Sequence, residues 1–261
     1  MSTICFGQQP CGFFPKRFLV SKIRTAKKLQ AETAGAGDSK EKSRIVFFYH
    51  DSDADYRETI TIMRDRQTNA EVRLNFTQEN KLQKKFSPLY AKRVPSGWKE
   101  EILKQLPRFT DRPLIGIFES VDKKTVADFC LEMYAKMGLI DGIEVVRSSD
   151  KKFREQAPDL AADYFADVEY QGEIVRAQMI DGKLQLHEGG GKYIALPAQT
   201  VEKSQISAAR DRRFAWMQSV INCNYYIYGE GERDYLDVSP FPNIKFIDRE
   251  PIDESGYAWL G

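Results

Sequence analysis

Short apolar runs that alternate with longer helical patterns constrain the fold of this chain most. The clearest is Arg44 to Tyr49, which is apolar after its arginine and so has no face suited to water. Ser2 to Phe6, Gly142 to Arg147 and Asn224 to Tyr228 are further strand-like runs with helical segments between them. Strands that alternate with helices form parallel sheets. The sequence therefore predicts an α/β, Rossmann-like fold.

The chain length allows one such domain with insertions. A chain of 261 residues can bury a sizeable core. We expect a single Rossmann-like domain over residues 1–261, with a helical and basic insertion at about 64–110. A second insertion, at about 167–200, is predicted as a small antiparallel hairpin unit, because Asp181-Gly182 and Gly189 to Gly191 are turn signals.

Composition excludes several classes of protein. The net charge of +1 argues against a global attraction to nucleic acid, and there is no apolar run long enough to cross a membrane. The first residues do not follow the plan of a secretory signal, and the four cysteines are scattered. We therefore expect a cytoplasmic protein with reduced thiols. With only His50 and His187 in the chain, a histidine-rich zinc site is excluded, and His187 is expected to be structural.

The first candidate site is the loop Gly7-Gln8-Gln9-Pro10, with Gly12 behind it. It follows the first predicted strand and precedes a helical pattern at Lys16 to Glu32. Glycines allow a ligand to approach the backbone, and glutamines offer both donors and acceptors. A simple turn is the alternative. Cys11 lies ahead of the helix N-terminus, where a thiolate would be stabilised.

The second candidate site directly follows the second strand. His50 to Glu58 contains the carboxylates of Asp53, Asp55 and Glu58. Ligands of parallel sheets bind beyond the carboxyl ends of the strands, so these groups should face the glutamine loop. They would orient a polar substrate, bind a divalent ion or hold an ammonium group. The alternative is a solvated acidic loop.

A basic segment between Thr77 and Phe109 carries interleaved aromatic residues, among them Phe86 and Trp98. This combination can bind single-stranded nucleic acid by stacking and charge neutralisation. Glutamates dilute the charge, so a solvated helical insertion is the preferred interpretation, and nucleic acid is disfavoured as a partner.

The later part of the chain repeats the strand–turn–helix pattern. Lys151 to Phe165 is predicted to be a helix. Gln205 to Ile221 begins with Ile206-Ser207 and becomes helical. Asn224 to Tyr228 then ends in a glycine-rich turn at Gly229, where the backbone again permits close approach of a ligand.

Four of these segments together resemble the bacillithiol biosynthesis cysteine-adding enzyme family. Gly7 to Pro10 is similar to that family's Gly-Gln-Gln-Pro-Gly loop, and Lys22 falls at the position of a lysine in the following helix. Phe47-Phe48 and the run from Asp53 to Glu58 resemble a Phe-Trp strand and an Asp-His-Asp-Phe-x-Glu motif. The remaining matches are to a Ser…Arg-Pro…Gly-Pro-x-Glu-x-x-Tyr segment and a Pro-Arg motif, and they fall on Ser207, Arg213, Gly229, Glu232, Tyr235 and Arg249.

The chain also departs from the family pattern. Ala54 replaces the histidine of Asp-His-Asp, and Cys11 replaces a glycine. Phe214 and Glu230 replace two prolines. The sequence ends where the family continues into a coiled-coil region used for dimerisation, so the resemblance covers the Rossmann-like core alone and leaves the oligomeric state open.

The resemblance implies a nucleotidylyltransferase-like core and a ligase activity that joins the carboxyl of cysteine to the amine of glucosaminyl malate. It implies that Gln8 and Gln9 orient the substrate, and that Lys22 and Arg213 meet phosphate or carboxylate oxygens. Asp53, Asp55 and Glu58 would hold an ammonium group or a metal ion, and Glu232 would bind a hydroxyl or orient Arg213. The remaining substrate- or nucleotide-binding candidates are Gly7, Gly12, Ser207, Gly229 and Arg249.

The expected partner is thus a small molecule with amine and carboxylate groups, and ATP or ADP is the candidate cofactor. Two alternatives stay open. One is a nucleotide- or metabolite-binding Rossmann module without catalysis. The other is a nucleotidyltransferase-like enzyme that acts on another small molecule.

Overall fold

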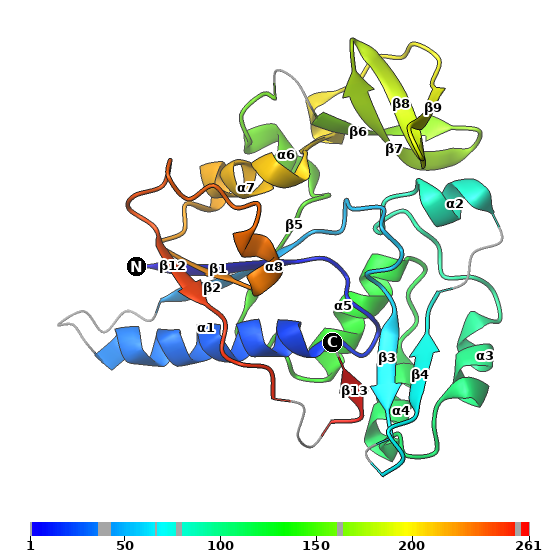
Figure 1. Ribbon diagram of the computed structural model, residues 1–261, viewed down its shortest axis with the longest axis vertical. Coiled ribbons are helices and arrows are strands. Elements are labelled where there is room, and N and C mark those ends of the chain that lie inside the picture. Colours follow the sequence, from blue (N-terminus) through cyan, green and yellow to red (C-terminus); the bar gives the residue numbers. More distant parts are fainter. Residues whose placement is uncertain are drawn as a thin grey trace.

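Five parallel strands form the centre of the molecule (Figure 1). The computed structural model describes residues 2–35, 43–65, 67–76, 80–160, 164–253 and 257–260. The strand order is β12-β11-β1-β2-β5, so β1 lies in the middle and the chain continues outward to either side of it. The predicted α/β, Rossmann-like fold is confirmed. The strands are β1 (Thr3–Gln8), β2 (Arg44–Tyr49), β5 (Glu144–Arg147), β11 (Tyr225–Tyr228) and β12 (Lys245–Asp248).

Alternate residues of the central strands belong to two separate apolar cores. On β1, Ile4 and Phe6 pack into one core, whereas Cys5 packs into the other. On β2, the Phe47 ring stacks on Phe6 with ring centroids 5.0 Å apart, while Phe48 points to the opposite face. Because both faces are covered, these strands can be apolar throughout, as the sequence pattern indicated.

Helices cover both faces of this sheet (Figure 1). One face packs against α1 (Arg17–Gly35) and α5 (Val126–Lys136), through residues such as Leu19 and Phe129. The opposite face packs against α6 (Lys151–Gln156) and α7 (Arg213–Ile221), through Phe153 and Trp216. No helix in the described ranges is both long enough and apolar enough to cross a membrane.

The region at about 64–110 contains strands as well as helices. The hairpin of β3 (Thr61–Arg64) and β4 (Glu71–Leu74) is joined by β13 (Trp259–Leu260). The helices α2 (Lys81–Lys85) and α3 (Trp98–Gln105) follow, and α4 (Arg112–Ser120) lies beyond them.

Two aromatic residues of this basic segment, Phe86 and Trp98, are buried and so cannot stack on nucleotide bases. Phe86 and Trp98 are 4% and 2% exposed. Trp98 stacks on Phe76, with ring centroids 4.3 Å apart, inside the larger apolar core. Their burial removes two of the stacking residues that the nucleic-acid interpretation required, whereas Tyr90 and Phe109 are partly buried.

The second insertion is a five-stranded antiparallel sheet in the order β10-β6-β7-β8-β9. Asp181 and Gly182 both have positive φ, as the tight turn between β7 and β8 requires. Gly189 to Gly191 also form a hairpin turn, between β8 and β9. The strands are β6 (Tyr164–Tyr170), β7 (Glu173–Ile180), β8 (Lys183–Gly189), β9 (Lys192–Ala195) and β10 (Ile206–Ala208).

The helix predicted for Lys151 to Phe165 is shorter than expected. It ends at Gln156, and Ala157 adopts an extended ψ of 153°. Pro158 is the cause, because the residue before a proline is disfavoured in the helical conformation. The chain instead enters β6 at Tyr164. Short 3₁₀ turns lie at Lys203–Gln205 and Arg210–Arg212, and a four-residue helix, α8, spans Glu230–Arg233.

Candidate functional site

A cavity of about 300 Å³ lies at the carboxyl ends of the central parallel strands. β1 is paired with β2 on one side and with β11 on the other, so the strand order reverses at β1. Ligands of open α/β sheets bind at such a switch point. Nine predicted site residues line this cavity: Gly7, Gln8, Gln9, Lys22, Glu58, Arg213, Gly229, Glu232 and Arg249.

Lys22 is the most deeply placed cation of the cavity wall. It comes from α1 and is 2% exposed. Its Nζ donates to the carbonyl of Gly7 at 2.8 Å and forms a close ion pair with Glu232. The Oε1 of Gln8 lies 3.5 Å from the same nitrogen. The lysine thus joins the first loop to α8.

The carboxylate of Glu232, in the first turn of α8, contacts three hydrogen-bond donors. Besides Lys22, it accepts from the backbone N–H of Gly229 at 2.9 Å and from the hydroxyl of Tyr226 at 3.1 Å. Burial, with the negative charge of Glu232 beside it, raises the pKa of Tyr226 well above its usual value. Tyr226 therefore remains a neutral hydrogen-bond donor at this position.

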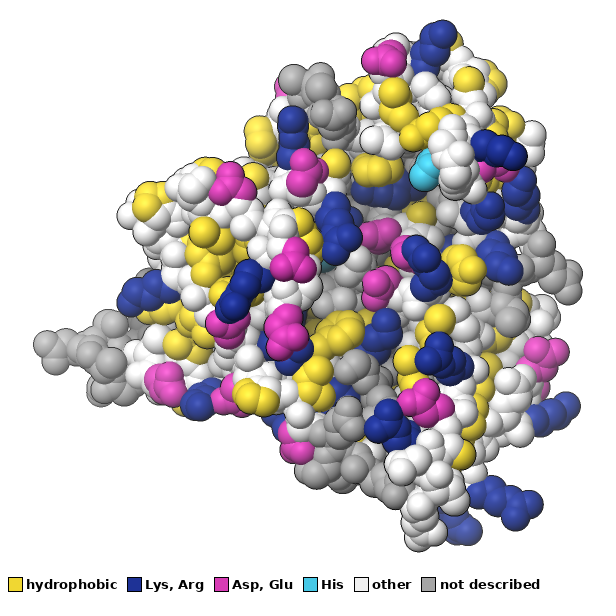
Figure 2. Space-filling model, in the orientation of Figure 1, with side chains coloured by type: hydrophobic (Ala, Val, Ile, Leu, Met, Phe, Trp, Pro, Cys, Tyr) yellow, Lys and Arg dark blue, Asp and Glu magenta, His cyan; other side chains and the backbone are white. Residues whose placement is uncertain are grey.

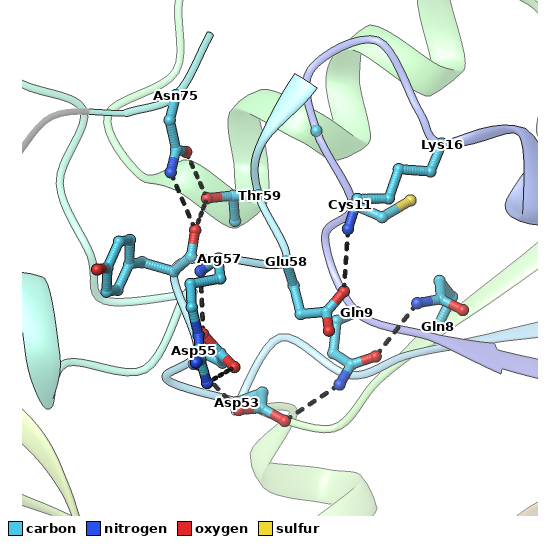
Figure 3. A network of polar contacts seen from close by, with 12 residues as sticks. Gln8, Gln9, Cys11, Lys16, Asp53, Asp55, Arg57, Glu58, Thr59 and Asn75 are labelled. Carbon is cyan, nitrogen blue, oxygen red and sulfur yellow. Dashed lines mark hydrogen bonds and ion pairs between the residues drawn. The ribbon is translucent and has the colours of Figure 1, made fainter. Parts of the chain in front are cut away.

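Asp53 and Arg213 form a second ion pair beside the cavity. Arg213 lies at the start of α7, and its Nη2 is 3.0 Å from Oδ2 of Asp53. The same carboxylate oxygen accepts from Nε2 of Gln9 at 3.3 Å, so Asp53 orients both cavity residues (Figure 3). Burial acts to raise the pKa of Asp53, but Arg213 and Arg176 together hold it well below its usual value.

The three predicted carboxylates do not converge. Asp55 is turned toward Arg57, whose Nε and Nη2 donate to it at 2.9 and 2.8 Å (Figure 3). Glu58 reaches the cavity and pairs with Lys16 at 3.3 Å. Within the described ranges, no group of three or more His, Cys, Asp or Glu side chains is arranged to hold a metal ion.

Gly12 and Cys11 lie behind the cavity wall, not in it. Gly12 has a φ of +96°, and a Cβ there would lie 2.8 Å from Oγ1 of Thr61. This glycine therefore allows the loop to pack against β3. Burial raises the pKa of the fully buried Cys11 thiol to about 11, so the expectation of a stabilised thiolate is wrong. Its thiol instead contacts the hydroxyl of Tyr134.

Ser207 is a packing residue of β10. It is 1% exposed, and its hydroxyl accepts from Nη1 of Arg176 at 2.5 Å. Arg176 comes from β7, and no sequence signal placed it near the site. Burial lowers its pKa to about 10, against the opposing influence of Asp167 and Asp53. Arg176 thus brings a buried positive charge from the antiparallel sheet toward Asp53.

Arg210 and His50 are cavity residues to which the sequence assigned no role. Arg210 lies over the ring of Tyr235, 4.2 Å from its centroid, and both line the cavity. Among the described residues, neither Arg210 nor Arg249 has a carboxylate partner within 4.0 Å, in contrast to Lys22 and Arg213. His50 directly follows β2, and this position at the carboxyl end of a strand is the sequence signal that could have identified it as a cavity residue.

Charged side chains of both signs surround the cavity on the face shown in Figure 2. Lys or Arg side chains lie beside Asp or Glu side chains near the centre of this face, below the antiparallel sheet of Figure 1. Such a lining suits a small polar molecule that itself carries both charges. No known protein-family model and no curated protein sequence matches the chain.

Proposed function

We propose that this chain is a ligase that forms a carbon–nitrogen bond, of the bacillithiol cysteine-adding type. Its substrates would be an amino acid carboxyl and the amine of a small sugar-like molecule. One observation carries the proposal: segments far apart in the sequence, each similar to a family motif, contribute Gln9, Glu58, Arg213, Glu232 and Arg249 to one cavity.

The charges of this cavity suit amide formation. Joining an amine to a carboxyl requires the two groups to be held together, and it requires cations to stabilise the developing oxyanion. Of the cations that line the cavity, Arg210 and Arg249 have no carboxylate partner within 4.0 Å among the described residues, so they offer the first contacts for a carboxylate or phosphate. Glu58 offers a carboxylate to a substrate ammonium group.

The ion pairs of Lys22 with Glu232 and of Arg213 with Asp53 give these residues a second capability. In each pair, a substrate carboxylate can take the place of the protein carboxylate, or a substrate ammonium group can take the place of the protein cation, because the charges are the same. ATP would activate the carboxyl by phosphoryl transfer, which yields ADP, and phosphate would leave as the amine forms the amide. The proposed role of Lys22 and Arg213 toward phosphate oxygens is compatible with the binding of either nucleotide.

The direct test supplies cysteine and glucosaminyl malate to the purified protein, with and without ATP, and follows the condensation product by mass spectrometry. We expect product from the unmodified chain and a loss of at least about tenfold in rate in Gln9→Ala and Arg213→Ala, because each removes a positioning hydrogen bond. Arg57→Ala is the matched control, since Arg57 pairs with Asp55 outside the cavity lining. Unchanged turnover in both cavity variants would refute the assigned site.

A non-catalytic binding module is the second candidate. The observation that favours it is Ala54, which supplies no acid–base side chain where the family has a histidine, and whose carbonyl accepts from the buried Lys92 at 3.2 Å. Such a module would bind ATP or ADP in calorimetry yet leave both nucleotides intact when amines and amino acids are added. Nucleotide consumption that depends on an added amine would exclude it.

A further inference from the structure

His50 is a cavity residue to which the proposed chemistry gives no role. It follows β2, and its ring packs edge-on against Phe48 with ring centroids 4.6 Å apart. His50 is 8% exposed, and a Cβ on Gly7 would lie only 2.7 Å from its Nε2. Both residues line the cavity, so the glycine leaves room for the Nε2 edge of the imidazole at the cavity wall.

The other ring nitrogen is enclosed. Within the part of the chain that the structure describes, Nδ1 of His50 is buried and forms no hydrogen bond. A neutral imidazole carries one N–H, and a buried donor without an acceptor costs the full desolvation of that group. Unpartnered buried donors are also rarer than under-satisfied acceptors. We therefore place the proton on Nε2, on the edge of the ring that faces Gly7.

The surroundings of His50 keep it neutral. Burial lowers its pKa well below the usual value, and Arg213 of α7, Lys22 of α1 and Arg176 of β7 lower it further. Asp53 opposes them, from the loop after β2. A neutral N–H in a positive local environment is suited to an anionic acceptor.

We propose that His50 contacts the substrate directly and donates its Nε2–H to a carboxylate or phosphate oxygen of the molecule held in the cavity. The inference rests on the proposed function, because it takes the cavity as the substrate site. Lys22 and Arg213 already bind Glu232 and Asp53, whereas His50 has no competing hydrogen-bond partner among the described residues. A substrate oxygen would therefore reach His50 without breaking an existing contact.

Nitrogen NMR of the full chain, labelled with ¹⁵N-histidine, tests this proposal without any turnover. The chain has two histidines, and the exposed His187 stacks on Tyr193 in the antiparallel sheet, so it is an internal reference. The variant His187→Gln assigns the two sets of signals. We expect His50 to be neutral with its proton on Nε2, and that Nε2 signal to move on addition of malate or inorganic phosphate while His187 stays in place.

The two anions distinguish a carboxylate site from a phosphate site. A proton found on Nδ1, a His50 signal that neither anion moves, or equal movement of both histidines would each overturn the proposal. If the His50 signal moves but no condensation product forms in the ligase assay, the anion site stands and the proposed function fails.

Two substitutions separate the donor from the ring volume. The side-chain amide introduced by His50→Gln would present an N–H near the Nε2 position, whereas His50→Leu fills similar space without a donor. We expect His50→Leu to weaken binding of the anion that moved the NMR signal by about 10- to 100-fold, and His50→Gln to retain affinity within a few-fold. Equal affinities for the unmodified chain and the leucine variant would contradict the proposal, and the NMR result on the unmodified chain decides it if that variant does not fold.

Discussion

At the scale of single residues, the packing around Gly7 ties the backbone of β1 to the shape of the cavity. The space that a side chain would need at this position is already occupied by His50 and by the hydroxyl of Tyr226, 3.0 Å from the ideal Cβ position. The His50 ring is itself packed against Phe48, so it cannot move away from Gly7 without disturbing the apolar core to which Phe48 belongs. Glycine is therefore the residue that this wall of the cavity requires.

Gly7→Ala should destabilise the fold by about 1–3 kcal/mol, which is the usual cost of overpacking a close-packed interior. The midpoint and slope of urea unfolding measure this change. Gly231→Ala in α8 is the matched control, because a Cβ there meets nothing within 4 Å and its free energy of unfolding should not fall. An unchanged midpoint for Gly7→Ala would show that the His50 ring can move aside.

At the scale of elements, the Asp53–Arg213 ion pair connects the loop after β2 to the start of α7. Both elements contribute residues to the cavity lining, and Nε2 of Gln9 from the first loop donates to the same carboxylate at 3.3 Å. Three segments of the chain thus share one charged group. Because the pKa of Asp53 is lower in the folded chain than in the unfolded one, its ionised form stabilises the fold.

Asp53→Asn should cost about 1–3 kcal/mol of unfolding free energy at pH 7, the range for a hydrogen bond to a charged group. The unfolded-state pKa of aspartate is about 3.9, so this difference is fully present above it. As the pH falls below about 4 towards the lower folded-state pKa, the difference shrinks, because the carboxylate of the unfolded chain takes up a proton while that of the folded chain is still ionised.

Urea unfolding at pH 7 and at pH 3 measures this dependence. The exposed Asp122→Asn serves as the control, with no change expected at either pH. A destabilisation by Asp53→Asn that is equally large at both pH values would contradict an ionic role for Asp53.

The elements themselves were largely predictable. The strands at Ser2 to Phe6, Arg44 to Tyr49 and Asn224 to Tyr228 have local apolar patterns, and each corresponds to β1, β2 or β11 within a few residues. The helix predicted for Lys151 to Phe165 begins as expected but ends at Gln156, because Pro158 disfavours the helical conformation at the residue before it. The extended segment expected at Thr59 to Met63 corresponds to β3, but β4 of the 64–110 region was missed, since this four-residue strand depends on pairing with β3.

The site was less predictable than the elements, because side-chain directions beyond a strand end depend on distant partners. Arg57 turns Asp55 away from the cavity, and Thr61 and Tyr134 enclose the loop at Gly12. Arg176 approaches Asp53 only through the register of the antiparallel sheet. No local pattern contains these contacts.

At the scale of the whole molecule, a buried ion cluster joins the antiparallel sheet to the parallel core. Asp167 of β6 accepts from Nη2 of Arg154 of α6 at 2.6 Å, and its other oxygen lies 3.7 Å from Arg176 of β7. The aspartate is 3% exposed and lies between two buried guanidinium groups. Its single negative charge therefore compensates cations from both parts of the structure.

Asp167→Asn should destabilise the protein by about 3–5 kcal/mol, because it leaves Arg154 buried without its ion-pair partner and removes one of the two carboxylates that offset the charge of Arg176. Asp159→Asn is the matched control: its partner Lys203 lies 3.0 Å away, but the aspartate side chain is 87% exposed. An exposed pair contributes about 0–1 kcal/mol. Thermal and urea unfolding of the two variants measure the contrast, and equal stabilities would argue against the cluster as a structural link.

The central position of β1 has a consequence for how the protein is made. Ile4 pairs with Ile45 on one side and with Tyr225 on the other, so the second partner of β1 is synthesised long after the first. On the ribosome, β1 and β2 can meet early, but one edge of β1 keeps its N–H and C=O groups unpaired until β11 emerges. The nascent chain is thus exposed to wrong strand pairing while the residues between β2 and β11 are synthesised, and the cavity forms only after β11 and α8 have been added.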